Sequence, residues 1–161
     1  MKRKIYLASP WFNEIEKSVM GAVIKKLREL DYEVYAPIEH TIPNAWNMTN
    51  REWGNRVFQA DIEAIQSVDE VWVINFGMYS DSGTAWECGY AYGLGKPITQ
   101  LLFTEKSNNI FSLMMVNGCS GYDTVSSFLY NLELSIDDIE VKWGVWYENV
   151  YFRCGLFLCS D

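Results

Sequence analysis

The sequence predicts an α/β fold in which a parallel sheet is covered by helices on both faces. Four short segments, at residues 5–8, 33–36, 71–74 and 98–103, have the composition of strands. Three of them are almost continuously apolar, which is typical of strands buried on both faces. Helical segments alternate with them, and this order implies right-handed crossovers between parallel strands. We therefore expect a flavodoxin-like three-layer sandwich with a central parallel sheet of about five strands.

Two long segments carry an apolar stripe at helical spacing. The first covers residues 13–30, where Asn13 is an N-cap candidate and Glu16 stands three positions later, the pattern of a capping box. The second covers residues 50–68 and repeats the same spacing of apolar side chains. Shorter helices are expected at residues 84–94, 110–116 and 125–132.

Composition and charge narrow the class of protein. The chain has 161 residues, 49% of them hydrophobic, which suits one domain with a substantial core. Its formal net charge of −8 argues against DNA or RNA as a partner, because neutralising phosphates requires clustered Lys and Arg. With four cysteines, no C-x-x-C pair and one histidine, no metal site is expected. No apolar run approaches the roughly 20 residues of a membrane span, so we expect a cytoplasmic protein without membrane contact.

Two kinds of chemistry lack their sequence patterns. The chain contains no G-x-x-x-x-G-K-[ST] phosphate loop, and Gly89, Gly93 and Gly95 do not have the G-x-G-x-x-G spacing of dinucleotide-binding proteins. A nucleophilic triad would have to use His40, and no G-x-S-x-G elbow accompanies it. Carboxylates are therefore the main candidates for catalysis.

Asp61 is the first unusual carboxylate. It stands between Val57 and Ile65 at helical spacing, so it falls on the apolar face of its predicted helix. Burying a carboxylate is costly unless it is paired. Asp61 is either a functional group or an ordinary residue at the edge of the stripe, partly exposed or bonded to a backbone donor.

The segment from Asp81 to Tyr90 is the second unusual feature, because it follows a predicted strand and opens a helix. The spacing of Thr84 and Glu87 fits a capping box, which would make Glu87 purely structural. The same position suits a functional carboxylate, since a helix N-terminus would favour its ionised form as a nucleophile. Both interpretations stay open on spacing alone.

Aromatic residues gather at the end of the first predicted strand. Tyr6, Trp11 and Phe12 are either ordinary core residues or a platform on which a flat base could stack. Carboxylates, an aromatic platform, no expected metal and no phosphate loop together suit cleavage of a glycosidic bond through an oxocarbenium-like state.

In these residues the chain resembles the nucleoside 2-deoxyribosyltransferase family. The resemblance rests on Ile5-Tyr6-x-x-x-x-Trp11-Phe12, on Asp81-x-Gly83-x-x-x-Glu87-x-Gly89-Tyr90-Ala91, on Asp61 and on the pair Leu113-Met114. It runs from about Lys4 to Tyr151. It implies a transferase that moves a 2-deoxyribosyl group between nucleobases and needs no cofactor.

The resemblance also implies roles for the carboxylates. Glu87 would attack the anomeric carbon and form a covalent deoxyribosyl intermediate, with net retention after the second attack. Tyr6 would orient Glu87. Asp61 and Asp81 would bind the base and help to protonate it as it leaves.

The remaining implied roles concern binding and assembly. Trp11 and Phe12 would flank the base, and a neighbouring subunit of a dimer-based homo-oligomer, up to a hexamer, would complete the sugar site. Ser112 and Met114 are the candidates there, although relatives often carry Asn where this chain has Ser112. The partners would be a deoxynucleoside and a free nucleobase.

The resemblance divides the chain and leaves alternatives. Residues 1–151 would form the catalytic domain and residues 152–161 a C-terminal extension, which we expect to pack on the surface or at a subunit interface. A hydrolase of the same fold, cleaving a nucleoside or deoxynucleotide, is one alternative function. A protein that binds nucleosides without catalysis is another, and the pair Asp81 and Glu87 argues against it, because a pure binder needs no nucleophile.

Overall fold

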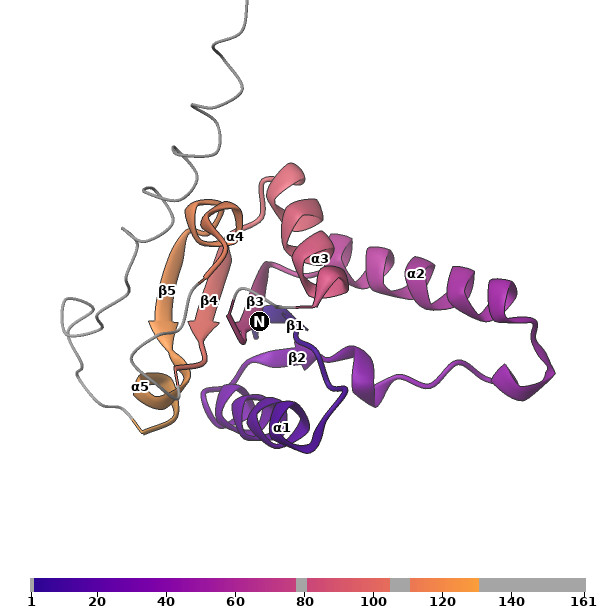
Figure 1. Ribbon diagram of the computed structural model, residues 1–161, viewed down its shortest axis with the longest axis horizontal. Coiled ribbons are helices and arrows are strands. Elements are labelled where there is room, and N and C mark those ends of the chain that lie inside the picture. The colour runs from indigo at the N-terminus through magenta and orange to yellow at the C-terminus, as the bar shows by residue number, and fades with distance from the viewer. Residues whose placement is uncertain (1, 78–80, 105–110, 131–161) are drawn as a thin grey trace, which may run out of the picture.

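The computed structural model describes residues 2–77, 81–104 and 111–130 (Figure 1). Five parallel strands form one sheet in the order β2-β1-β3-β4-β5. The strands are β1 (Lys4–Ala8), β2 (Glu33–Tyr35), β3 (Glu70–Asn75), β4 (Ile98–Leu102) and β5 (Gly121–Thr124). The helices are α1 (Glu14–Glu29), α2 (Asn50–Ser67), α3 (Ser82–Gly93), α4 (Leu113–Asn117) and α5 (Val125–Tyr130), with 3-10 turns η1 (Pro37–Glu39) and η2 (Ala45–Asn47). The predicted flavodoxin-like α/β fold is confirmed.

The sheet separates two hydrophobic cores, one on each face. Side chains alternate along a strand, so Ile5 and Leu7 of β1 pack toward α1 and α5, whereas Tyr6 and Ala8 pack toward α2 and α3. Figure 1 shows α1 and α5 on one side of the sheet and α3 on the other, with α2 extending beyond the sheet edge. This alternation places Tyr6 on the face where α3 lies.

The helix α1 begins as its sequence predicts. The Asn13 side chain accepts a hydrogen bond from the backbone N–H of Glu16 at 2.9 Å, and the Glu16 carboxylate accepts from the backbone N–H of Asn13 at 3.3 Å. The same carboxylate accepts from the N–H of Phe12 at 2.7 Å. The capping box therefore also holds the segment that carries Trp11 and Phe12 at the carboxyl end of β1.

Sequence reasoning did not locate β5. Its residues 121–124 include Gly121 and Asp123, which are unfavourable in strands, and it pairs with β4 alone at the edge of the sheet. The helix expected at residues 110–116 is observed at Leu113–Asn117, and that expected at 125–132 covers Val125–Tyr130. The boundary at residue 151 and the extension 152–161 lie outside the described residues.

A chain of buried amides connects β3, β4 and α4. Asn75 and Gln100 are both fully buried, and Asn75 Nδ2 donates to Gln100 Oε1 at 2.9 Å. Gln100 Nε2 donates to the carbonyl of Met115, and Asn75 Oδ1 accepts from the backbone N–H of Gly77 at 3.0 Å. These bonds satisfy the buried amides and fix the start of the loop between β3 and α3.

We expect Gln100→Leu to destabilise the fold, because it leaves buried hydrogen-bonding groups of Asn75 and Met115 without their partner. The free energy of unfolding should fall by about 1–3 kcal/mol for each unsatisfied group. Urea denaturation measures the change, with Gln59→Leu on the exposed side of α2 as the matched control, expected within about 0.5 kcal/mol of wild type. Equal losses in the two variants would contradict a structural role for the buried amides.

Candidate active site

A hydrogen bond between β1 and α3 lies at the centre of the candidate site. The hydroxyl of Tyr6 donates to Oε1 of Glu87 at 2.7 Å. Tyr6 is fully buried in the central part of the sheet, so its hydroxyl has a fixed position. The bond therefore holds the Glu87 carboxyl in one orientation.

The Glu87 carboxyl has an unusual environment. Its pKa is raised from 4.5 to about 7: burial is the largest cause, the charges of Asp61 and Asp81 act in the same direction, and the hydrogen bond from Tyr6 acts in the opposite one. The expectation that a helix N-terminus keeps this carboxyl readily ionised is wrong. The group titrates near neutral pH, so both of its protonation states are accessible there.

The start of α3 differs from the predicted one, and the difference concerns Glu87 directly. Asp81 is the N-cap, and its Oδ2 accepts from the backbone N–H of Thr84 at 2.8 Å. The capping box of Thr84 and Glu87 is therefore wrong, because the helix starts at Ser82 and Glu87 lies in its second turn. Asp81 satisfies the helix end and leaves the Glu87 side chain available to Tyr6.

Gly83 lies so close to the Asp81 carboxylate that this position has no room for a side chain. A Cβ atom added at Gly83 would lie 2.7 Å from Oδ2 of Asp81, closer than nonbonded atoms approach. Any side chain at this position would displace the capping carboxylate. The glycine therefore serves the placement of Asp81.

Asp61 is half-buried on α2 and lines a cavity of about 650 Å³. Burial raises its pKa, whereas a hydrogen bond involving Tyr6 and the charge of His40 lower it. Its charge also raises the pKa of the Tyr6 and Glu87 side chains, so the three groups form one electrostatic unit. The position of Asp61 on an apolar helix face thus corresponds to a cavity wall.

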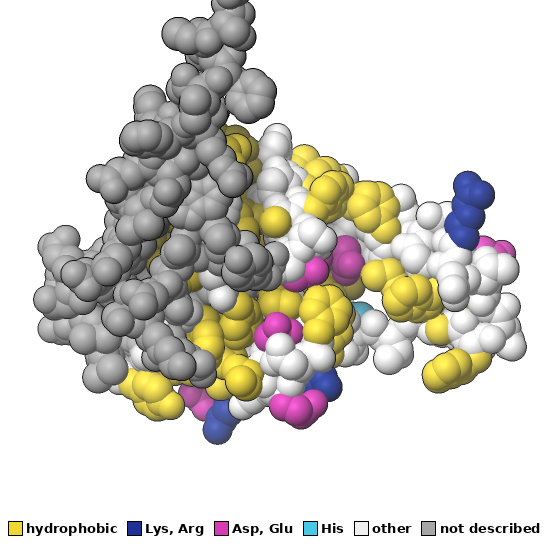
Figure 2. Space-filling view, viewed as in Figure 1, with side chains coloured by type: hydrophobic (Ala, Val, Ile, Leu, Met, Phe, Trp, Pro, Cys, Tyr) yellow, Lys and Arg dark blue, Asp and Glu magenta, His cyan; other side chains and the backbone are white. Residues whose placement is uncertain are grey.

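Apolar and aromatic side chains form the rest of this cavity. Trp11 lines it from the carboxyl end of β1, and Trp53 lines it from α2. Phe12 is not among the lining residues; its side chain is 73% exposed, and its ring lies 6.2 Å from that of Trp11. Figure 2 shows the hollow between α1 and the projecting end of α2, with apolar side chains around it.

Two further cavity residues come from the end of β2 and from the loop that follows it. Tyr35 at the end of β2 and His40 after η1 both line the cavity. The available signal was their place after a strand, since ligands of such sheets bind beyond the carboxyl ends of the strands. Their residue types alone carried no such information.

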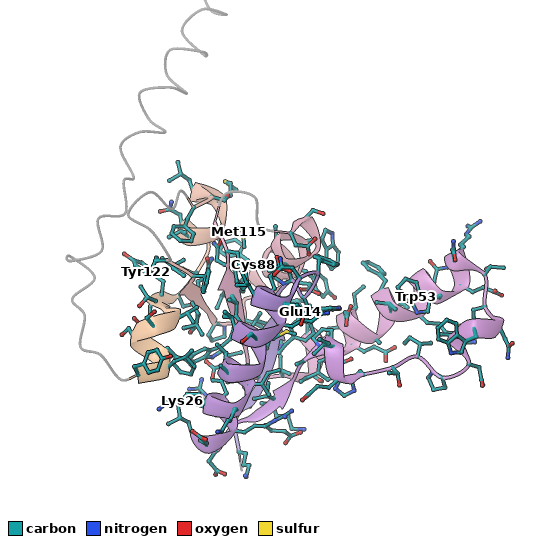
Figure 3. The ribbon with its side chains drawn as sticks, turned by 60° about the horizontal axis from the view of Figure 1, so that its bottom comes forward. Glu14, Lys26, Trp53, Cys88, Met115 and Tyr122 are labelled. Atoms are coloured by element: carbon teal, nitrogen blue, oxygen red, sulfur yellow. The ribbon has the colours of Figure 1, made fainter. Side chains whose placement is uncertain are left out.

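Ser112 and Met114 lie elsewhere in the single chain. They line a second cavity of about 460 Å³ between α3 and α4, which shares no lining residue with the first. Met114 is 85% exposed. In Figure 3, Cys88 and Met115 mark this second cavity, apart from Trp53 at the far end of the first. Neither Ser112 nor Met114 lines the cavity that Asp61 lines.

The described residues place a limit on other kinds of site. Within residues 2–77, 81–104 and 111–130, no group of three or more His, Cys, Asp or Glu side chains is arranged to hold a metal ion. No helix in these ranges has the length and apolar character needed to cross a membrane. What the site contains is a hydrogen-bonded pair of Glu87 and Tyr6 beside two aspartates and an aromatic cavity, the chemistry of a carboxylate-based enzyme.

Comparison with known proteins specifies this class. The family model described as nucleoside 2-deoxyribosyltransferase matches residues 5–140. A solved 2-deoxyribosyltransferase from the psychrotolerant bacterium Bacillus psychrosaccharolyticus is 32% identical, with a TM-score of 0.70 over 86% of this chain and 96% of that one. The chain belongs to the nucleoside 2-deoxyribosyltransferase family and is an enzyme of this type, which confirms the resemblance noted in the sequence.

Two further solved structures share the fold. A conserved protein from Enterococcus faecalis is 20% identical, with a TM-score of 0.67 over 82% of this chain and 100% of that one. A CMP N-glycosidase from Clostridium botulinum is 23% identical, with a TM-score of 0.57 over the same shares of the two chains. At these identities the likeness concerns the fold alone. No curated protein matches the sequence significantly.

The raised pKa of Glu87 predicts a pH-dependent cost to stability. The folded state binds the proton of the Glu87 carboxyl more tightly than the unfolded chain does. The stability that this proton contributes is fully present below about pH 4.5 and is lost as the pH rises through about 7. Glu87→Gln removes the ionisation and keeps an acceptor for Tyr6. Between about pH 5 and about pH 8, the variant should gain up to about 3 kcal/mol over wild type in unfolding free energy.

Urea denaturation across this pH range checks the prediction. Glu63→Gln, on the exposed side of α2, serves as the control and should follow the wild-type curve. If the curve of Glu87→Gln also runs parallel to that of wild type, the pKa of Glu87 is not raised.

Proposed function

We propose that this enzyme transfers a 2-deoxyribosyl group between nucleobases through a covalent glycosyl ester on Glu87, with net retention at the anomeric carbon. The observation that carries the proposal is the buried Glu87 carboxyl, held by the Tyr6 hydroxyl at 2.7 Å and flanked by two aspartates. Membership in the transferase family supports the substrate class.

The first step replaces a C–N bond by a C–O bond. An oxygen of the ionised Glu87 attacks the anomeric carbon, the N-glycosidic bond breaks, and the departing base keeps the bonding electron pair. Asp61 or Asp81 supplies the proton that neutralises the base. Burial supports the donor role, because it raises the pKa of Asp61 above its ordinary value. A pKa of about 7 leaves an ionised fraction of Glu87 for the attack at neutral pH.

The second step reverses the first with a different base. A ring nitrogen of the incoming base attacks the anomeric carbon, the ester bond to Glu87 breaks, and the carboxylate leaves with its electron pair. The proton lost by the incoming base returns to the aspartate. Each attack inverts the configuration, so two attacks retain it. Tyr6 is the positioning residue that keeps Glu87 directed at this carbon.

The remaining predicted residues have binding roles in this proposal. Trp11 and Phe12 flank the base at the mouth of the cavity that Asp61 lines. Ser112 and Met114 contact the sugar in the site of a second copy of the chain, which fits their place outside the cavity that Asp61 lines and the exposure of Met114. The homo-oligomer, built from dimers, and the cytoplasmic location stay predictions.

We expect Glu87→Ala to lower turnover on the order of 10³-fold or more, because the covalent route loses its nucleophile. The assay incubates the protein with deoxyinosine and free adenine and follows deoxyadenosine by chromatography. Glu63→Ala on the exposed side of α2 is the control and should keep wild-type turnover. Substantial exchange by Glu87→Ala would refute the nucleophile. Release of hypoxanthine by wild type without adenine, undiminished when adenine is present, would favour the hydrolase.

Asp61→Asn and Asp81→Asn should each lower kcat/KM for deoxyinosine by about 10²–10⁴-fold, the usual contribution of general acid catalysis. For a nitrophenyl deoxyriboside, whose leaving group needs no proton, kcat/KM should fall much less in the same variants. Comparing kcat/KM for the two substrates in each variant measures the difference. Equal losses on both substrates would assign the aspartates to binding or folding instead of proton transfer.

A further inference from the structure

The short helix α4 carries Ser112 and Met114 at its start, and little within the helix itself fixes where it lies. It has five residues, too few for a helix to be stable alone, and the Ser112 side chain forms no capping hydrogen bond. Its position therefore comes from contacts with the sheet. Met115 and Val116 are buried, but apolar burial has no preferred direction, so it decides the inward face of α4 without fixing its height or rotation.

A directional contact to α4 comes from Gln100 on β4. The side chain is fully buried, and its Nε2 donates to the backbone carbonyl of Met115. Met115 lies in the last turn of the helix, where carbonyls lack partners within the helix. A hydrogen bond weakens steeply when its angle is poor. The bond from Gln100 therefore restricts both the height and the rotation of α4 over the sheet.

Asn75 decides which end of the Gln100 amide faces α4. Asn75 Oδ1 accepts from the backbone N–H of Gly77 at 3.0 Å, which leaves Asn75 Nδ2 to donate to Gln100 Oε1 at 2.9 Å. Because each amide has one acceptor end and one donor end, Nε2 of Gln100 is then the end directed at Met115. A backbone N–H just after β3 thus sets the direction of every bond as far as α4.

These amides lie on the face of the sheet that carries the candidate site. Asn75 stands two positions after Val73 on β3, and Gln100 two positions after Ile98 on β4. Since side chains alternate along a strand, both amides point to the core that contains Tyr6. Replacing both members of a buried hydrogen-bonded pair by apolar groups of the same shape costs little stability. What the two amides supply, and apolar side chains would not, is direction.

We propose that Asn75 and Gln100 are positioning residues for the sugar site, because they hold α4 so that Ser112 and Met114 meet the sugar bound by a second copy of the chain. The inference rests on the proposed function, which assigns Ser112 and Met114 to the sugar. None of the amide-bonded residues lines the cavity that Asp61 lines, which is the proposed base site. Loss of the amide bonds should therefore weaken binding of a sugar-bearing substrate and spare that of a free base.

Calorimetry in a Glu87→Gln background tests the inference without turnover, because this variant lacks the proposed nucleophile. Deoxyinosine and hypoxanthine are titrated separately, and the two ligands differ by the sugar alone. Gln100→Met keeps the length of the side chain and removes both amide bonds. We expect it to raise the dissociation constant of deoxyinosine about tenfold, the loss of roughly one well-formed contact, and to leave that of hypoxanthine within about twofold.

A second variant and a control accompany Gln100→Met. Gln100→Asn keeps a buried amide but is one methylene shorter, so it cannot reach both Asn75 and Met115. It is the milder change for folding, and it should raise the dissociation constant of deoxyinosine alone, by about threefold. Thr99→Val is the matched control, since Thr99 is the half-buried neighbour on β4 whose side chain points to the opposite face. It should keep both dissociation constants.

A merely structural role of the amides predicts a different result. Partial unfolding would lower the number of binding sites per chain and leave both dissociation constants unchanged, and a general loosening of the domain would raise both by the same factor. Either result in the folded variants would overturn the inference. The exchange assay above reports separately on the transferase proposal. A selective loss of deoxyinosine binding, without exchange by wild type, would reject the transferase and leave the positioning role standing.

Discussion

The hydrogen bond between Tyr6 and Glu87 is the contact around which this site is organised. It joins the interior strand β1 to α3, and the two residues are 81 positions apart in the sequence. A buried carboxyl without a partner would be costly, and a buried tyrosine hydroxyl without one would be costly as well. Each group satisfies the other, so the bond lets the fold keep a titratable carboxyl inside a largely apolar face.

The electrostatics of the site follow from this burial. Asp61 and Asp81 approach Glu87 closely enough for their charges to raise its pKa, and burial acts in the same direction. Glu87 and Asp61 ionise less easily than they would in water, because the pKa of each is raised. Protons are therefore held near the place where a glycosidic bond would break, which is the requirement for a reaction that needs one ionised and one protonated carboxyl.

The architecture assigns different elements to different parts of the ligand. The carboxyl ends of β1 and β2, together with α2, build an aromatic cavity that suits a flat base. Helix α3 provides Glu87 to one side and contributes to a separate cavity with α4 on another side. Asp81 links these parts, because it caps the N-terminus of α3 and also adds negative charge near Glu87.

The sequence by itself determined the order of strands and helices, because buried parallel strands require apolar runs and the helices between them require an apolar stripe. It also indicated Tyr6, Asp61, Asp81, Glu87 and Trp11, which the fold does gather in one region. It could not locate β5, whose edge position places little demand on its residues. It also left open whether Glu87 is part of a helix cap, since spacing alone does not show that Asp81 takes that place.

Only the tertiary structure decided the environment of each group. The pKa of Glu87 depends on burial and on the charge of Asp61 from α2, and neither is visible in the sequence around Glu87. His40 had no interpretable neighbours in the chain, yet it stacks on Tyr35 and shares a cavity with Asp61. Ser112 and Met114 match a family motif, but they lie at a different cavity of the same chain. Local patterns determine strands and helices, because the periodicity of apolar residues shows which face is buried. A site is made by contacts between residues distant in sequence, and these contacts form only once the sheet and its helices have packed.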